Sequence, residues 1–341
     1  MERHFLGWGR PLPVSAVEWF LAQRDDGGTA AVIDLSDWIA VFPTARAGRR
    51  FLELLAHRLQ GRNRVFLPPQ VVTVGGLPEL LYRNQRPFAP TPVQTLAWVT
   101  ALEELRRRSP ASVERILRRP PAADDLPERL QAGDWFLRLH AELSGAGLTF
   151  EEAARRAQQQ IPDFPEGPRW QALAELQTIY LEVLDAHGFW DVHAARLHAV
   201  RRGECRTARP IALVGIVDPP GILRAMLDSL DDRATALVAA PTTEAHRFDR
   251  WGALVPEVWR ELPEPPCPDR ICVVDQAVAQ AAKLEETLRQ WSKEFAAGEI
   301  TLGLADESLA PLFLRILERL EVPARYGPGA PLTESLPWRL L

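Results

Sequence analysis

Strand-length apolar runs lie on both sides of a long stretch of helical pattern, and this order constrains the fold more than any other feature of the chain. Residues 30–42 and 65–74 have strand composition, and an arginine-rich helix is predicted between them at 45–60. Further strands are predicted at 211–218 and 234–241, again with a helix between them. Strand–helix–strand units of this length predict a parallel sheet in an α/β domain.

The stretch between these two pairs of strands has a helical pattern throughout. From residue 76 to residue 205, apolar residues recur at helical spacing, and prolines and glycines separate the successive segments. The pattern therefore predicts a large all-helical insertion within the α/β domain.

A second α/β unit is expected after a proline-rich linker at 261–270. Strand and helix patterns alternate there in the order 271–275, 276–296, 300–306 and 308–320. The last residues, PWRLL, are typical of the first turn of another helix, so we expect a piece of a longer protein. The predicted domains are a first α/β domain in two parts, the helical insertion, and the start of a second α/β domain: residues 1–75 and 206–262, 76–205, and 263–341.

The overall charge excludes a protein that attracts nucleic acid through its whole surface. Forty Lys and Arg residues stand against 45 Asp and Glu, for a net charge of −5. Three cysteines are too few for a disulfide framework. The longest apolar runs are far too short to span a membrane, and the N-terminus lacks the apolar region of a secretory signal. We therefore expect a cytoplasmic protein with no membrane partner.

Positive charge is concentrated in residues 43–64. Six arginines stand there against the single acid Glu53: Arg46, Arg49, Arg50, Arg58, Arg62 and Arg64. Thr44 is placed to cap the predicted helix, and Thr73 has a comparable position at the end of the next predicted strand. The residues alone leave two interpretations open: a solvated helix face with an N-cap, or a surface that binds the phosphates of nucleic acid.

Five segments, by their order and spacing, resemble the beginning of the AddB-like subunits of bacterial AddAB helicase–nucleases. An α/β unit interrupted by helices and followed by a second α/β unit is also the layout of superfamily 1 helicases and their degenerate relatives. The resemblance covers nearly the whole chain but only about the first third of such a subunit. The segments are HFLGWGRPLPVSAVEWFLA at 4–22, VFPTARAGRRFLELL at 41–55, LPPQVVTVGGLPELLY at 67–82, RWQALAELQTIYLEVLDAHGFWD at 169–191, and residues 300–341.

The resemblance implies a RecA-like (P-loop NTPase-like) parallel-sheet domain in a protein that processes DNA ends for recombinational double-strand break repair. It implies two partners, DNA and an AddA-like helicase–nuclease subunit. In that family ATP and magnesium are bound by the motor partner, and a metal and an iron–sulfur cluster belong to a C-terminal nuclease domain. For this chain the resemblance implies no catalytic residue, no cofactor and no metal. It places five residues against a single DNA strand: Thr44, Arg46, Arg49, Arg50 and Thr73.

ATP binding would require a phosphate loop that the sequence lacks. A P-loop cradles phosphates with backbone amides and reaches them with a lysine. Where the resemblance places that loop, residues 7–11 are GWGRP, which contain no lysine and a proline that removes an amide. The second acidic motif is also reduced, because two prolines follow Asp218 instead of a second carboxylate. We therefore expect this domain neither to bind nor to hydrolyse ATP.

Two alternatives from other classes stay open. One is an active NTPase with an atypical phosphate loop, which the binding of an ATP analogue would reveal. The other is a protein-interaction scaffold with no DNA role, which the absence of salt-dependent DNA binding would indicate.

Three further groups of residues favour structural roles. A second basic cluster is expected to form an exposed helix face balanced by nearby glutamates, and contact with duplex DNA is the alternative. The cluster comprises Arg106, Arg107, Arg108, Arg115, Arg118 and Arg119. The histidines at 187, 193 and 198 lack the companions of a metal site. The tryptophans of the helical patterns have positions typical of core packing: Trp98, Trp135, Trp170 and Trp291.

Overall fold

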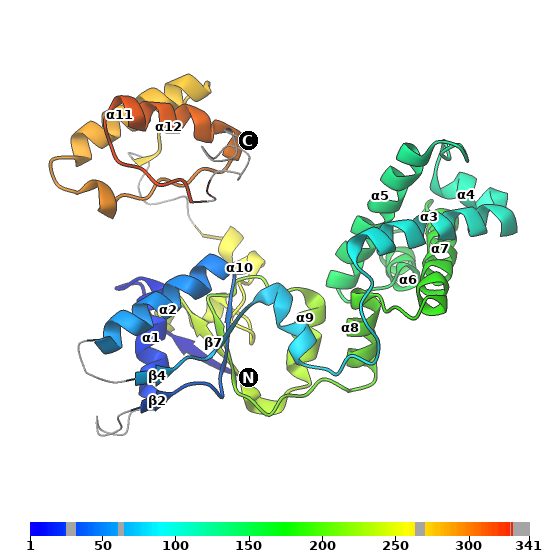
Figure 1. The fold of residues 1–341 in the computed structure, drawn as a ribbon, viewed down its shortest axis with the longest axis horizontal. Helices are drawn as coiled ribbons and strands as arrows, with labels where there is room; N and C mark the ends of the chain where they lie inside the picture. The colour runs from blue at the N-terminus through cyan, green and yellow to red at the C-terminus, as the bar shows by residue number, and fades with distance from the viewer. Residues whose placement is uncertain (25–31, 61–64, 263–269, 328, 330–341) are drawn as a thin grey trace, which may run out of the picture. The chain divides into compact units, whose positions relative to one another are not determined.

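The computed structural model describes residues 1–24, 32–60, 65–262, 270–327 and 329. The chain divides into two compact units, Met1–Leu262 and Pro263–Leu341 (Figure 1). Several residues of the sequence analysis lie outside the described ranges: Arg62, Arg64, one of the three cysteines (Cys267) and the final PWRLL segment, with most of the proline-rich linker.

The first unit is built on a five-stranded sheet in which every pair of neighbours is parallel. Its strands, in chain order, are β1 (Glu2–Phe5), β3 (Ile39–Phe42), β5 (Gln70–Thr73), β6 (Ile211–Val214) and β7 (Ala234–Val238). Their order across the sheet is β1-β7-β6-β3-β5. The predicted α/β class with a parallel central sheet is thus confirmed.

Two of the predicted strands are each split into two by local chemistry. The 30–42 segment forms β2 (Val32–Asp34) and β3, because Asp34 turns the chain by accepting a hydrogen bond from the Ser36 amide at 2.9 Å. The 65–74 segment forms β4 (Val65–Leu67) and β5, with Pro68 and Pro69 between them. Strands β2 and β4 pair in a separate two-stranded parallel sheet.

Helices cover both faces of the main sheet, which explains why its inner strands are apolar throughout. The side chains of Ile39, Val41 and Leu213 pack with α8 (Val192–Arg201) and α9 (Gly221–Asp228). On the opposite face, the alternate residues of the same strands pack against α1 (Leu12–Ala22) and α2 (Ala45–Gln60). The strands contribute Ala40, Phe42, Ala212 and Val214, and the helices contribute Phe20, Phe51 and Leu55. The alternation places the two cores on either side of the strands.

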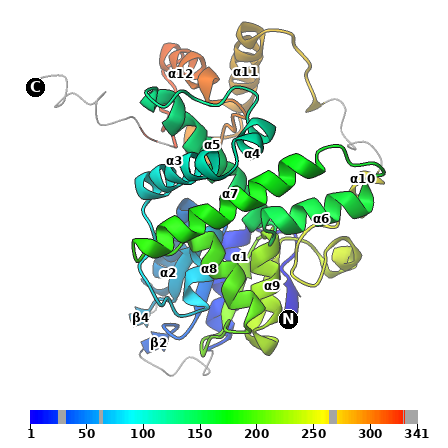
Figure 2. The same ribbon diagram turned by 90° about the vertical axis from the view of Figure 1, so that its right-hand side faces the viewer.

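Six helices lie between β5 and β6 in the chain: α3 (Thr91–Arg108), α4 (Pro110–Ile116), α5 (Leu126–Gly145), α6 (Phe150–Gln160), α7 (Gly167–Ala186) and α8. The first five have a core of their own around Trp98, which stacks on Tyr180 at 4.0 Å between ring centroids. α7 packs against α3, α4 and α6 (Figure 2). Side chains define the helix starts: Thr149 forms a capping box with Glu152.

A buried polar network joins these helices. Asp191 caps α8 by accepting from the Ala194 amide at 2.8 Å, and it also accepts from Tyr180 at 2.8 Å. His140 donates its Nε2–H to Asp191 at 2.9 Å, since its Nδ1 accepts from the Gln177 amide. Burial opposes the ionisation of Asp191, but these hydrogen bonds outweigh it and lower its pKa to about 2. The carboxylate therefore stays charged inside the helical core.

The second unit has helices and no strand among its described residues. Helices α11 (Ala277–Trp291) and α12 (Ala310–Arg319) pack together, and Glu285 pairs with Arg319 and Arg289. The strands predicted at 271–275 and 300–306 are wrong: both segments are irregular, and Val273 is 90% exposed. A strand requires a neighbour for its backbone groups, and neither segment pairs with one among the described residues.

A short helix, α10 (Pro256–Arg260), follows the last strand of the first unit. None of the helices within the described residues is long and apolar enough to cross a bilayer.

Candidate nucleic-acid interface

The carboxyl ends of β3 and β5 place two of the predicted DNA-contact residues on one edge of the sheet. Phe42, the last residue of β3, is in register with Thr73, the last residue of β5, and Thr44 follows two residues after Phe42. The chain leaves β3 toward β5 and leaves β6 toward β7 on the other side, so the strand order reverses between β3 and β6. In open parallel sheets, ligands bind at the carboxyl edge beside such a reversal.

Thr44 caps α2, as the sequence predicts. Its Oγ1 accepts from the Ala47 amide at 3.2 Å, and its carbonyl accepts from the Gly48 amide at 3.2 Å. Gly48 lets the helix lie close to the sheet, because a Cβ there would stand 2.5 Å from Val71 Cγ1. The start of α2, with its partial positive charge, is thus held beside the end of β5.

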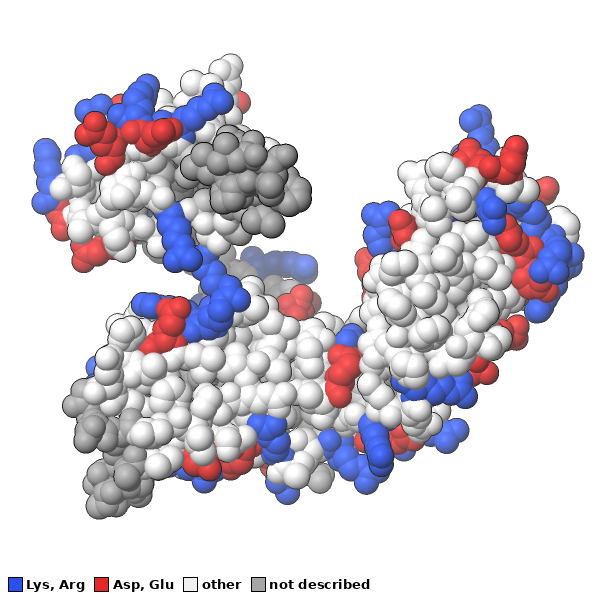
Figure 3. Space-filling view, viewed as in Figure 1, with Lys and Arg blue, Asp and Glu red and all other residues white. Residues whose placement is uncertain are grey.

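The arginines of α2 differ in whether their charge is already paired. Arg46 and Arg49 are exposed and form no ion pair with any described residue. Arg50 pairs with Glu53 at 3.0 Å, and Arg58 pairs with Glu18 at 2.8 Å. Figure 3 shows basic side chains over α2. The uncompensated charge therefore lies in the first turns of the helix, next to Thr44.

Thr73 is half-buried at the same edge. Its carbonyl accepts from the Leu77 amide at 3.2 Å as the chain turns into two short 3₁₀ segments, Val74–Gly76 and Pro78–Leu80. The structure thus brings Thr44, Arg46, Arg49 and Thr73 to neighbouring elements, while Arg50 is engaged by Glu53.

Hydrogen bonds hold the loop after β1 against the segment that follows β7. Gly7, at φ +75°, donates to the Ala240 carbonyl at 2.9 Å, and the Trp8 indole donates to Ala239 at 2.8 Å. At the start of α1, the Val14 and Ser15 amides both donate to the Pro11 carbonyl. Position 13 is a proline and has no N–H. The absence of a lysine from residues 7–11 and the prolines at 11 and 13 distinguish this loop from a P-loop.

The acidic residue predicted at the end of β6 lies elsewhere. β6 ends at Val214, and Asp218 follows in a loop with its side chain 92% exposed, 3.5 Å from Arg224. Gly215, at φ +63°, ends the strand early and packs against Leu12, since a Cβ there would stand 2.4 Å from Leu12 Cδ2. The prediction of a strand reaching residue 218 is therefore wrong.

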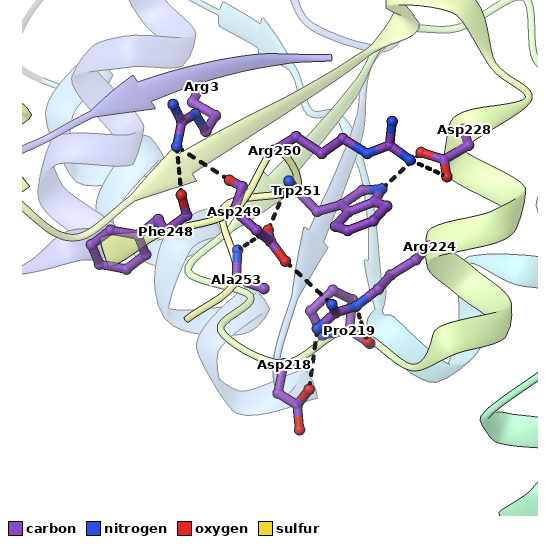
Figure 4. A network of polar contacts seen from close by, with 10 residues as sticks. All are labelled: Arg3, Asp218, Pro219, Arg224, Asp228, Phe248, Asp249, Arg250, Trp251 and Ala253. Atoms are coloured by element: carbon purple, nitrogen blue, oxygen red, sulfur yellow. Dashed lines mark hydrogen bonds and ion pairs between the residues drawn. The ribbon is translucent and has the colours of Figure 1, made fainter. Parts of the chain in front are cut away.

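Sequence reasoning also missed a polar network around Asp249 (Figure 4). Its carboxylate accepts from the Trp251 and Ala253 amides at 2.9 and 3.0 Å and pairs with Arg224 at 3.2 Å. Arg3 of β1 donates to the Phe248 and Asp249 carbonyls. Trp251 lies against the guanidinium groups of Arg224 and Arg250, at 5.1 and 4.3 Å. The network joins the segment after β7 to β1 and α9, and no local pattern announces it.

The second basic cluster is only partly balanced. Arg107 and Arg108 both pair with Glu104, and Arg106 donates to the Pro121 carbonyl. The glutamate-balanced face predicted from the sequence holds for Arg107 and Arg108 but not for Arg106. Three members of the cluster pair with no described carboxylate: Arg115, Arg118 and Arg119.

The histidines pack as side chains of the helical region. His193 lies 5.6 Å from His140 between ring centroids, and His198 lies 5.9 Å from Trp190. Burial lowers the pKa of His193. Within the described part of the chain, no group of three or more metal-ligating side chains is gathered.

The tryptophan prediction is correct for Trp98, which is fully buried, and wrong for Trp135 and Trp291, which are 39% and 45% exposed.

Comparison with known proteins does not assign the chain to a family: no family model matches it, and no curated protein matches it significantly.

Proposed function

We propose that the chain is a non-catalytic, helicase-like scaffold of the AddB type that binds a DNA strand and an AddA-type motor subunit during DNA end processing. The five-stranded parallel sheet supports a RecA-like domain, and the six helices between β5 and β6 support the helical insertion of that layout. The segments that resemble AddB-like subunits run through both units. This proposal makes the protein a participant in recombinational double-strand break repair.

The observation that carries the DNA contact is the group at the carboxyl edge of the sheet. Two exposed, unpaired arginines, Arg46 and Arg49, flank the capped start of α2, and Thr73 ends the neighbouring strand. Helix starts and arginines both bind phosphate oxygens, one through amides and the partial dipole, the other through charge. Neither arginine has to leave a carboxylate partner among the described residues before it binds DNA.

The scaffold role, without a motor, is supported by the loop after β1. Its Gly7 amide already donates to the Ala240 carbonyl, and the loop contains no lysine to reach a phosphate. The chemistry of ATP hydrolysis would then belong to the partner subunit.

The test is fluorescence anisotropy of a labelled single-stranded oligonucleotide across a salt series. Replacing Arg46 and Arg49 by glutamine removes two phosphate contacts, so the slope of log affinity against log salt falls in magnitude by about 1.4. The matched control replaces Arg107 and Arg108, which have the same total charge but are paired with Glu104. Equal slopes for both double variants would refute the sheet-edge contact.

A further inference from the structure

A basic hollow in the helical region lies apart from the carboxyl edge of the sheet. Its volume is about 520 Å³, and its lining residues come from the end of α4, the middle of α5 and the start of α7. Figure 1 shows where these three helices lie in the fold. It is lined by both charged and apolar side chains, including Arg115, Arg118, Trp135, Glu166 and Arg169. A hollow of this size falls within the range of ligand-binding pockets.

The charge of this hollow is positive and largely uncompensated. Arg169 pairs with Glu166 at 3.2 Å. Arg115 and Arg118 are exposed and pair with no described carboxylate. The start of α7 adds the partial positive charge of a 20-residue helix. An anionic ligand would therefore meet two arginines that have no competing partner in the described chain.

Trp135 gives the hollow an aromatic wall. It lies on α5 and is 39% exposed, in contrast to Trp98 of the same region, which is fully buried. Its neighbour Phe136 contacts it edge to face at 5.0 Å and belongs to the core. Exposed tryptophan beside arginine is the combination that stacks an unpaired base while the guanidinium groups hold its phosphates.

We propose that this hollow binds single-stranded nucleic acid, with a base against Trp135 and the backbone phosphates on Arg115 and Arg118. Duplex fits less well, because its bases are stacked inside the helix and cannot reach a side chain at the wall of a hollow. An acidic peptide would satisfy the arginines but would leave the tryptophan without a stacking partner. The site goes beyond the proposed function and does not depend on it, since the carboxyl edge of the sheet contributes none of its residues.

The experiment measures binding of fluorescein-labelled dT and rU dodecamers to the whole chain. Trp135→Ala is expected to weaken binding of at least one of them about fivefold or more, whereas Trp135→Phe, which keeps a stacking ring, retains most of the affinity. The Arg115→Gln, Arg118→Gln double variant is expected to lower the salt slope by about 1.4. A difference between the two oligomers would identify DNA or RNA as the preferred strand.

Control variants remove the same side-chain types elsewhere. Trp291→Ala deletes a tryptophan that is 45% exposed in the second unit, and Arg315→Gln deletes an exposed arginine of α12. Both are expected to bind as wild type. Thermal unfolding followed by circular dichroism establishes that each variant is folded. If Trp135→Ala does not fold, the affinity of Trp135→Phe provides the test.

In the binding experiment, each of the following outcomes overturns the inference: wild-type affinity in Trp135→Ala, equal loss in Trp135→Phe and Trp135→Ala, or displacement of the oligonucleotides by a decaglutamate peptide of similar charge. Photocrosslinking with 5-bromouracil separates this site from the sheet edge. Crosslinks confined to α2 would support the proposed function and refute the hollow. Crosslinks confined to α5 would support the hollow and refute the DNA contact at the sheet edge. If the wild-type protein binds neither oligonucleotide, both sites are refuted.

Discussion

At the scale of single residues, the Asp191 carboxylate is a buried charge at the centre of the polar network of the helical region. It is 2% exposed and accepts hydrogen bonds from His140, Tyr180 and the Ala194 amide. A buried charge is tolerated only when such donors replace water. Because the three donors come from α5, α7 and α8, this one side chain links three helices, of which α5 and α8 are far apart in the sequence.

Asp191→Asn should therefore lower the free energy of unfolding by about 2–3 kcal/mol, the loss expected for hydrogen bonds to a charged group. Urea unfolding at neutral pH measures it. The control is Asp185→Asn, an exposed carboxylate paired with Arg86, for which the expected loss is below about 1 kcal/mol.

Wild type and the Asp191→Asn variant, compared across pH, also test the pKa of Asp191. Its value is lowered from 3.8 to about 2, so the folded protein keeps the charge that the unfolded chain loses first. This stabilisation is complete above the unfolded pKa and is lost as the pH falls through the folded pKa. The stability difference between wild type and Asp191→Asn should thus shrink between pH 4 and 2, and a constant difference would contradict the assignment.

At the scale of elements, close packing of helices depends on glycine at particular contacts. Gly133 of α5 lies against α3, where a Cβ would stand 2.7 Å from the Thr95 carbonyl oxygen. Gly145, near the end of the same helix, has open space around it. One residue type thus has two roles in one helix, and only the neighbouring helix distinguishes them.

Gly133→Ala should destabilise the protein by about 1–3 kcal/mol, because the added methyl group forces α3 and α5 apart. Gly145→Ala should stabilise it by up to about 1 kcal/mol, since alanine favours the helix and meets no neighbour. Thermal unfolding of the two variants side by side gives the comparison. Similar effects of the same sign would show that the α3–α5 contact is looser than the structure has it.

At the scale of the whole molecule, the cores of the first unit are complete within Met1–Leu262. The residues of the sheet cores, of the helical core and of the small cluster after β7 all lie in this range. Hydrophobic burial is the main source of stability, so this unit has the content of an independent domain.

A protein comprising residues 1–262 is therefore expected to unfold cooperatively, with a midpoint within a few degrees of the corresponding transition in the full chain. Differential scanning calorimetry of both proteins measures this. A shortened protein that melts without a cooperative transition would show that the second unit completes the fold of the first.

From residue 30 to residue 241, the order of strand and helix regions follows from the sequence, because apolar periodicity and breaking residues act locally. The strand β1 at Glu2–Phe5 was not predicted, and it is held by pairing with β7, which is distant in the sequence. The Thr44 cap and the arginine-rich helix follow for the same reason. The expected strands at 271–275 and 300–306 fail because a strand depends on a partner strand, which a local pattern does not specify.

Which charges are free was decided by the tertiary structure alone. Arg46 and Arg49 are left without an ion pair, while Arg58 of the same helix finds Glu18, 40 residues earlier in the chain. The exposure of Trp135 and the burial of Asp191 were likewise decided by how the helices pack in the folded chain. Ion pairs, stacking and desolvation depend on distances through space, so residues of one type receive different roles only when the chain has folded.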